Sequence, residues 1–265
     1  MRIARLCCLL LLAGSSLAVQ AKMVHRPVEW TQDGTRFHSV LVYDDATLVK
    51  RPGLVMVPNW YGVNDAAVKK AEMIAGKDYV ILLTDMYGAD VRPTTNAQAQ
   101  AAVKPLYGDR ALMRKRIGVA LEQLKAQVAG APLDPAKLAA IGFCFGGSAV
   151  LDLARSGADV AAVVSFHGGL ATDDPALAKN IKGKVLALNG GDDKSITAEQ
   201  IAGFEKEMRD ANVDWQFVNF GGTVHCFAIP TAHGGDGANC NYNEKSARRG
   251  HTMMRNFFDE VFAAH

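Results

Sequence analysis

Short apolar runs alternate with longer segments of helical spacing along most of the chain. The runs are rich in branched and aromatic residues and predict strands at 37–43, 53–57, 79–83, 138–141, 160–166, 184–188 and 215–220. Apolar positions recur every three or four residues in segments that predict helices at 65–75, 110–128, 147–155, 196–211 and 244–262. This alternation indicates an α/β fold, a doubly wound and mostly parallel sheet with helices on both faces.

The character of the runs predicts where each strand lies in the sheet. Segments 54–57 and 160–164 are almost continuously apolar, which is typical of central parallel strands that are buried on both faces. The run 37–43 carries interspersed polar residues, so we expect it to form an antiparallel edge. The alanine-rich stretch 97–102 suits an exposed helix.

The first 21 residues follow the pattern of a secretory signal peptide. Arg2 and Arg5 precede an apolar run over 6–13, and small residues then lead to Ala21, after which we expect cleavage. The run is too short for a stable membrane span. We therefore expect a periplasmic or secreted protein in which residues 22–265 form a single domain, because no linker or internal repeat divides them.

Charge in the mature chain is balanced. Arg2 and Arg5 leave with the signal peptide, and 27 basic and 27 acidic side chains remain. This balance offers no basic field for nucleic acid, and no later segment has the length and apolarity of a membrane span. A small-molecule substrate is the expected partner, with the protein a monomer or a small homo-oligomer.

A Gly-x-Cys-x-Gly pattern follows the run 138–141. Glycines on both sides of Cys144 permit a sharp strand-to-helix turn that exposes the nucleophile, while the next backbone N–H can face a developing oxyanion. No serine in the chain has glycine two residues before and after it, so Cys144 is the candidate nucleophile. The alternative is a tight turn with a small buried cysteine.

An acid and a histidine follow Cys144 in an informative order. Asp193 comes after the predicted strand 184–188, and His225 comes after the strand 215–220. Ligands of parallel sheets gather at the carboxyl ends of strands, and nucleophile, acid, histidine is the chain order of α/β hydrolases. The order favours acyl transfer through the Cys144 thiol over the reading as a simple turn.

Three cysteines remain after signal-peptide removal. The simplest pairing joins Cys226 to Cys240 and leaves Cys144 free, as expected for an exported protein with an odd number of cysteines. Such a bridge would close a loop rich in glycine and asparagine. The spacing alone leaves the pairing open, because a bridge depends on the separation of the Cα atoms.

Several separate motifs together resemble the dienelactone hydrolase family of α/β hydrolases over nearly all of the mature chain. The motifs are the loop 58–63, Asp85-Met86-Tyr87-Gly88, the elbow 142–147, Asn189-Gly190-Gly191-Asp192-Asp193, His225-Cys226-Phe227-Ala228, and Tyr242-Asn243-Glu244. The resemblance implies a Cys144, Asp193, His225 triad, with the acid at the second of the two adjacent aspartates. It also implies an oxyanion hole formed by the backbone N–H groups of Trp60 and Phe145, in agreement with the general rule for elbow enzymes.

Two positions depart from the family pattern. Asn59 stands where typical members carry a glutamate that interacts with the resting thiol, so we hypothesise a standing thiolate–imidazolium pair of Cys144 and His225. The alternative is that Asn59 only bonds loop backbone. Ile229 stands where dienelactone-cleaving members use a carboxylate-binding arginine, and 95–104 holds no arginine either. These absences favour a neutral ester or thioester as substrate.

Aromatic residues near these motifs are candidates for the substrate pocket. Trp60 and Tyr61 lie on the loop of the oxyanion hole and are expected to line the pocket together with Asn59. Phe145 and Phe227 are expected to face the pocket, and Phe143 to pack in the core. No histidine pair has zinc-ligand spacing and no glycine-rich nucleotide motif is present, so we expect neither metal nor cofactor.

These features predict an exported hydrolase that cleaves a small ester, lactone or thioester through a thioester acyl-enzyme. The alternative is a scaffold that kept the fold and binds ligands without turnover. A thiol redox role ranks behind both, because the chain has no Cys-x-x-Cys motif.

Overall fold

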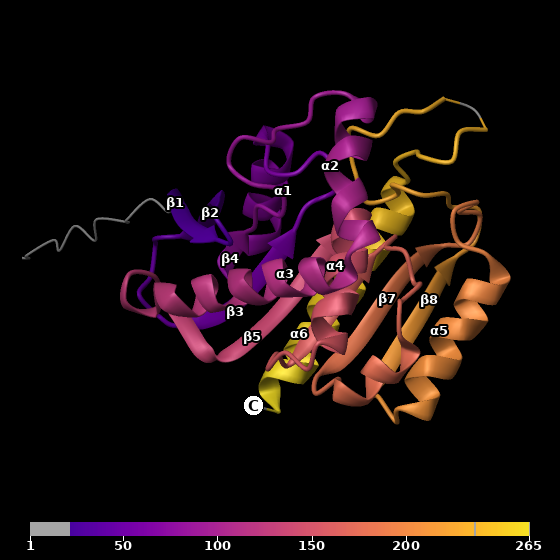
Figure 1. Ribbon diagram of the computed structural model, residues 1–265. Helices are drawn as coiled ribbons and strands as arrows, with labels where there is room; N and C mark the ends of the chain where they lie inside the picture. The colour runs from indigo at the N-terminus through magenta and orange to yellow at the C-terminus, as the bar shows by residue number, and fades with distance from the viewer. Residues whose placement is uncertain (1–21, 236, 265) are drawn as a thin grey trace, which may run out of the picture.

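The computed structural model describes residues 22–235 and 237–264 (Figure 1). The predicted signal peptide lies outside the described residues. Eight strands form one sheet in the order β1-β2-β4-β3-β5-β6-β7-β8. The strands are β1 (Met23–Gln32), β2 (Thr35–Asp44), β3 (Arg51–Val57), β4 (Val80–Leu83), β5 (Leu133–Phe143), β6 (Ala162–Phe166), β7 (Lys184–Gly190) and β8 (Trp215–Phe220).

Helices cover both faces of this sheet, which confirms the predicted fold class. They are α1 (Asp65–Ala75), α2 (Asn96–Gly108), α3 (Arg110–Lys125), α4 (Phe145–Arg155), α5 (Ala198–Asp210) and α6 (Glu244–Ala263), with short 3₁₀ segments η1 (Ala126–Ala129) and η2 (Pro175–Asn180). Buried side chains of α2, α3, α4 and α5 pack on one face of the sheet, and those of α1 and α6 pack on the other (Figure 1).

The edge of the sheet differs from the prediction. The run 37–43 lies in β2, which is antiparallel to both neighbours but sits between β1 and β4, so β1 forms the edge. Most side chains of β1 are only partly buried or exposed, and the strand therefore has no continuous apolar run. The tight turn from β1 to β2 contains Asp33 and Gly34, both with positive φ, and this Asp-Gly pair is the signal that could have revealed the hairpin.

The alanine-rich stretch 97–102 lies in α2, whose first turn has a capping box. Thr95 accepts a hydrogen bond from the Gln98 backbone N–H, and the Gln98 side chain bonds back to the Thr95 backbone. Ala99, Val103 and Leu106 are buried on the inner face, so the helix is amphipathic rather than fully exposed.

Strands β3 to β8 all run parallel, so their carboxyl ends meet at one edge of the sheet. The loops that leave β3, β5, β7 and β8 carry the candidate site residues predicted from the sequence. The topology alone therefore brings segments that are up to about 170 residues apart in the chain to one place.

Candidate active site

Cys144 lies at the sharp turn between β5 and α4. Its backbone has φ of 56°, in the left-handed region that side chains rarely adopt. The flanking glycines leave room for this turn, since a Cβ on Gly142 would collide with the Gly146 carbonyl and a Cβ on Gly146 would collide with the Val57 carbonyl. The turn presents the partly exposed Cys144 thiol at the amino end of α4.

His225 connects the thiol to an acid. Its Nε2 lies 3.1 Å from Cys144 Sγ, and its Nδ1 lies 2.6 Å from Asp193 Oδ2. The loops that carry Asp193 and His225 pack closely, because Gly190 has no side chain that would collide with the carbonyls of Thr223 and Val224. The structure thus brings together the three residues that the sequence predicted as a triad.

Asp193 is fixed by contacts that the sequence analysis missed. Its Oδ1 accepts hydrogen bonds from the Ser195 backbone N–H (2.9 Å), the Ser195 hydroxyl (2.5 Å) and the Asn239 side-chain amide (3.0 Å). The neighbouring Asp192 is exposed. Asp193 is only 4% exposed and is therefore the aspartate whose carboxylate orients His225.

The electrostatics of this group favour a charged imidazole. Burial by itself would lower the pKa of His225, but its hydrogen bonds to Asp193 and Cys144 outweigh burial and raise that pKa above its ordinary value. Burial by itself would also raise the pKa of Asp193, yet the hydrogen bonds from His225 and Ser195 hold it below its usual range. Asp193 is therefore ionised at neutral pH and stabilises a proton on His225.

Cys226 and Cys240 form a disulfide, and Cys144 is the free cysteine among the described residues. The bridge closes the loop that begins directly after His225 and contains Asn239. Asn239 reaches back from this loop to both Asp193 and Ser195. The disulfide therefore anchors one of the hydrogen-bond donors that hold the acid.

The backbone amides of Phe145 and Trp60, which were predicted to form the oxyanion hole, have no hydrogen-bond acceptor among the described residues. The Phe145 N–H is the first of α4 and has no acceptor within the helix, and the Trp60 N–H pairs with no acceptor in the described part of the chain. The Tyr87 hydroxyl donates to the Trp60 carbonyl (3.0 Å) and so fixes the turn after β3. Both amides are therefore free to donate to another group, and the oxyanion hole itself stays a prediction.

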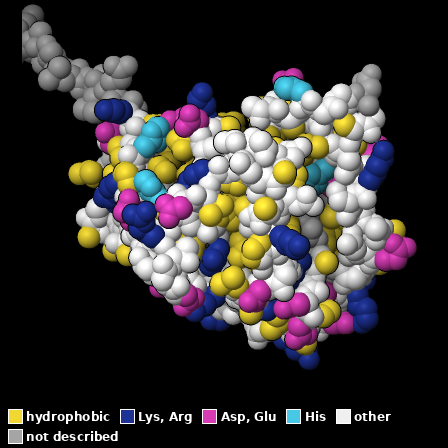
Figure 2. All heavy atoms as spheres, turned by 45° about the horizontal axis from the view of Figure 1, so that its top comes forward, with side chains coloured by type: hydrophobic (Ala, Val, Ile, Leu, Met, Phe, Trp, Pro, Cys, Tyr) yellow, Lys and Arg dark blue, Asp and Glu magenta, His cyan; other side chains and the backbone are white. Residues whose placement is uncertain are grey.

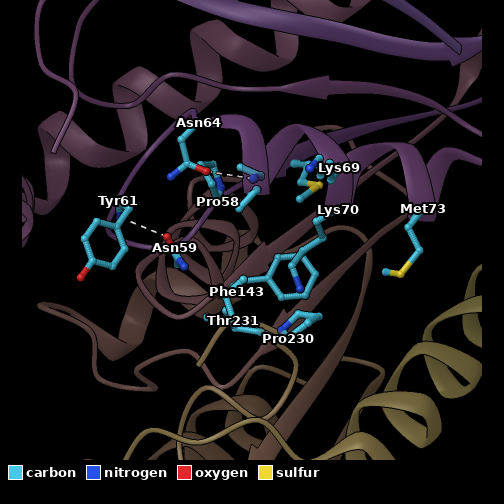
Figure 3. Close-up of a pocket in the computed structure, with 14 residues that line it drawn as sticks. Pro58, Asn59, Tyr61, Asn64, Lys69, Lys70, Met73, Phe143, Pro230 and Thr231 are labelled. Carbon is cyan, nitrogen blue, oxygen red and sulfur yellow. Dashed lines mark hydrogen bonds between the residues drawn. The ribbon is translucent and has the colours of Figure 1, made fainter. Parts of the chain in front are cut away.

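A cavity of about 290 Å³ opens beside the elbow, between α1, the loop after β3 and the segment 229–231 (Figure 3). Asn59, Tyr61 and Phe143 all line it. Asn59 accepts a hydrogen bond from the Tyr61 backbone N–H (3.0 Å) and thus bonds loop backbone, the alternative role considered for it. The Tyr61 hydroxyl donates to Asn96.

Three aromatic predictions for this pocket were wrong. Phe227 is fully buried in the core and packs on Phe220 and Phe166 instead of facing the cavity. Phe145 is also buried, between the rings of Tyr87 and Tyr107. Trp60 does not line the cavity either and packs against the core instead. Phe143 is buried in the core as predicted, and its ring also lines the cavity. A single residue's place on a loop or helix end does not reveal which way its ring points, and the neighbouring elements decide it.

Lys70 is a cavity residue that the sequence analysis missed. It extends from α1, donates to the Ala228 carbonyl, and holds its ammonium 4.4 Å from the centre of the Phe143 ring (Figure 3). Burial lowers the pKa of Lys70 to about 8. No carboxylate of the described residues forms an ion pair with it, and no acidic side chain lines the cavity.

Other binding chemistry finds little support in the described ranges. Residues 22–235 and 237–264 hold no cluster of three or more histidine, cysteine or acidic side chains that could bind a metal ion. None of the helices in these ranges has the length and apolarity needed to cross a bilayer. On the face shown in Figure 2, acidic and basic side chains are interspersed rather than gathered by sign.

The comparisons with known proteins agree with this geometry. The family model described as "Dienelactone hydrolase family" matches residues 37–262. The chain belongs to the dienelactone hydrolase family. Its likeness to solved structures covers 90% of the chain and 98% of each of two relatives, both with a TM-score of 0.84. One is titled "m3DLH" (39% identical), and the other is a dienelactone hydrolase-like promiscuous phosphotriesterase from metagenomic libraries (36% identical).

A curated relative adds information about chemistry. The Bradyrhizobium protein named "Probable 2-oxo-3-(5-oxofuran-2-ylidene)propanoate lactonase" is 27% identical over 213 residues, which cover 76% of this chain and 84% of the relative. Together with the family match, these relatives identify the chain as an ester or lactone hydrolase. Membership in this dienelactone hydrolase family therefore favours catalysis over the ligand-binding scaffold.

Proposed function

We propose that this dienelactone hydrolase family member is exported and cleaves a small ester, lactone or thioester through a thioester on Cys144. The observation that carries the proposal is the hydrogen-bonded chain from Cys144 Sγ to His225 and from His225 to Asp193, at 3.1 Å and 2.6 Å. In acyl transfer a nucleophile needs a base within hydrogen-bond reach, and the base needs a third group that fixes its orientation.

The first half of the reaction forms the acyl-enzyme. His225 holds the thiol proton, and Cys144 Sγ attacks the substrate carbonyl carbon. The Trp60 and Phe145 N–H groups donate to the oxygen as it becomes negative, aided by the positive end of α4. When the tetrahedral intermediate collapses, the bond to the leaving group breaks and His225 gives that group its proton. The product alcohol or thiol departs, and the acyl group stays on sulfur.

The second half releases the acid. His225 takes a proton from water, and the resulting hydroxide attacks the thioester carbonyl. The carbon–sulfur bond then breaks, and the proton on His225 returns to the leaving sulfur. Asp193 stays ionised throughout and stabilises each protonated state of His225.

The proposal is tested by alkylation of the purified mature protein, residues 22–265. Cys226 and Cys240 are bridged, so iodoacetamide without reductant should modify Cys144 alone. We expect hydrolysis of short p-nitrophenyl esters and thioesters to fall in proportion to the fraction of protein carrying one label. Full turnover by completely labelled protein would contradict the thiol mechanism.

Export is a further part of the proposal. It rests on the signal-peptide pattern of residues 1–21, and the Cys226–Cys240 disulfide suits an oxidising compartment. Mass spectrometry of protein from the periplasm or medium of an expressing bacterium should find a mature N-terminus at Lys22. Retention of the uncleaved chain in the cytoplasm would contradict export.

Ile229, in place of an arginine, favoured a neutral substrate, but Lys70 supplies a positive charge in the same cavity. Both residues line the cavity, so its wall is apolar at Ile229 but cationic at Lys70. An anionic end on the acyl group would meet a partly buried ammonium without a carboxylate partner, where attraction is stronger than in water. We therefore expect the parent to favour acidic half-esters over neutral esters of the same length.

Lys70→Met retains the aliphatic stem and removes the charge. It should lower kcat/KM for a p-nitrophenyl half-ester of a dicarboxylic acid about 10-fold and leave a neutral ester within about 2-fold. Lys69→Met is the matched control, because Lys69 lines the same cavity from an exposed position. Since burial lowers the pKa of Lys70 to about 8, the ammonium is present below that pH, and the preference should fade as pH rises through it. Equal losses for both substrates would contradict the charge argument.

A further inference from the structure

His167 lies directly behind the nucleophile and has no part in the proposed reaction. It is the first residue after β6, its side chain is fully buried, and its backbone has φ of 40°. Its backbone N–H donates to the Leu188 carbonyl in the last part of β7 (2.8 Å). A histidine held in this rare conformation at the carboxyl ends of two central strands has little freedom to move.

One ring nitrogen of His167 contacts the nucleophile's own backbone. The Cys144 N–H donates to His167 Nδ1 at 3.1 Å and shares its hydrogen with the Phe166 carbonyl at 3.0 Å. A ring nitrogen that accepts carries no proton, so the neutral ring has its hydrogen on Nε2. The Cys144 N–H is therefore held by two acceptors, and one of them is available only while His167 is neutral.

The surroundings of His167 keep the ring neutral. Burial lowers the pKa of His167 well below its ordinary value, and the charges of His225 and Lys70 act in the same direction. Asp193 opposes them, and the remaining neighbours include the uncharged rings of Phe143 and Phe227. A protonated His167 would place a second positive charge beside the His225 imidazolium.

The same ring also supports the catalytic base. The rings of His167 and His225 meet edge to face, with their centres 5.0 Å apart. His167 thus touches the backbone of the nucleophile and the side chain of the base at once. We propose that His167 is a positioning residue that sets the distance and angle between Cys144 Sγ and His225 Nε2, which deepens the function proposed above and rests on it.

Stability alone does not explain a histidine at this position. Its Nε2 is buried and has no hydrogen-bond partner among the described residues. A buried donor without an acceptor is unfavourable, and phenylalanine would fill the same space without a polar atom. The feature that phenylalanine lacks is the second acceptor for the Cys144 N–H, beside the Phe166 carbonyl.

The test compares two substitutions with opposite expected effects. His167→Phe keeps the ring and loses the acceptor, while His167→Asn loses the ring and keeps an acceptor near the place of Nδ1. His251→Phe is the matched control, because His251 is a half-buried histidine whose buried Nδ1 also has no partner, and its ring packs against Phe166. Its ring has no recorded contact with Cys144 or His225 among the described residues.

The readouts are kcat and KM for a neutral p-nitrophenyl ester, thermal unfolding, and the pH profile of Cys144 alkylation. We expect His167→Phe to be at least as stable as the parent, with kcat about 10- to 100-fold lower and KM little changed, because a small misplacement of reacting atoms is costly. The pH midpoint of alkylation should rise, since a looser contact with His225 stabilises the thiolate less. His167→Asn should be the less stable variant and the more active one, and His251→Phe should keep the parent's alkylation midpoint.

Apart from the substituted histidine, the charged and titratable groups around the thiol are the same in all variants, namely His225, Asp193, Lys70 and the hydroxyls of Tyr87 and Tyr107. The proposal is overturned if His167→Phe keeps the parent's kcat and alkylation profile within about 2-fold, or if activity follows stability across the two His167 variants. Alkylation requires no turnover, so an inactive parent would refute the proposed hydrolysis while the alkylation profiles still decide the role of His167.

Discussion

Replacing Cys144 with alanine is expected to lower kcat for a short p-nitrophenyl ester about 10⁴-fold or more. The substitution removes the sulfur atom that attacks the carbonyl carbon. Direct attack by water is then the only route left, and it is much slower. His225→Ala should cause a loss of similar size, because the thiol then has no partner at 3.1 Å to take and return its proton. The double variant should be no worse than either single variant, since the two residues act as one unit.

Two adjacent aspartates provide the control for these losses. Asp193→Asn should lower kcat by about 10²- to 10⁴-fold, because a side-chain amide can donate to His225 Nδ1 and force the proton of the neutral ring onto Nε2, toward Cys144. Asp192→Asn changes the same charge at an exposed position and should stay within about 2-fold of the parent. Steady-state kinetics of the five variants, with circular dichroism to confirm folding, provides the measurement. Equal effects of the two asparagine substitutions would contradict the assignment.

Glu207→Ala is expected to lower the free energy of unfolding by about 3–5 kcal/mol. Arg155 on α4 is almost completely buried and makes two hydrogen bonds to Glu207 on α5, at 2.7 Å and 2.8 Å. It also bonds Asp152 (3.1 Å) and the Leu170 carbonyl (3.0 Å), so its donors are well used. Removal of Glu207 leaves part of a buried cation without its counter-ion, and urea unfolding followed by fluorescence measures the cost.

The matched control lies on the same helix. Glu205 forms a more exposed ion pair with Arg209, at 3.6 Å, and Glu205→Ala should cost less than about 1 kcal/mol. The double variant Arg155→Met, Glu207→Met should recover part of the loss, because it removes the unpaired charge that Glu207→Ala leaves. If Glu205→Ala were as destabilising as Glu207→Ala, burial of the Arg155 pair would not be the cause.

The sequence predicted the interior of the fold better than its edge. Central strands such as β3 and β6 are buried on both faces, so their apolar runs stand out from the surrounding sequence. The edge strand β1 is half solvated and was not predicted. Without it, β2 was expected at the edge, whereas it lies in the interior of the sheet. Helix α1 was predicted at its observed bounds, because its apolar stripe and its end at Gly76 both mark it.

The part of the candidate site that depends on strand order alone was predictable from the sequence. Cys144, Asp193 and His225 each follow a parallel strand, and parallel strands end at one edge, so their meeting follows from topology. Ser195, Asn239, Lys70 and His167 were missed because their roles depend on how side chains from separate loops and helices pack. No local pattern marks an α1 lysine that reaches the segment after His225, nor a histidine that accepts from the Cys144 amide.

The central claim is that the acyl group passes through a thioester on Cys144. Rapid acid quench of the mature enzyme with a p-nitrophenyl ester, followed by intact and peptide mass spectrometry, tests it most directly. We expect a transient adduct with the mass of the acyl group on the peptide that contains Cys144, formed with a burst of nitrophenolate and absent in Cys144→Ala. Ester turnover without any adduct, or with the acyl group on another residue, would contradict it.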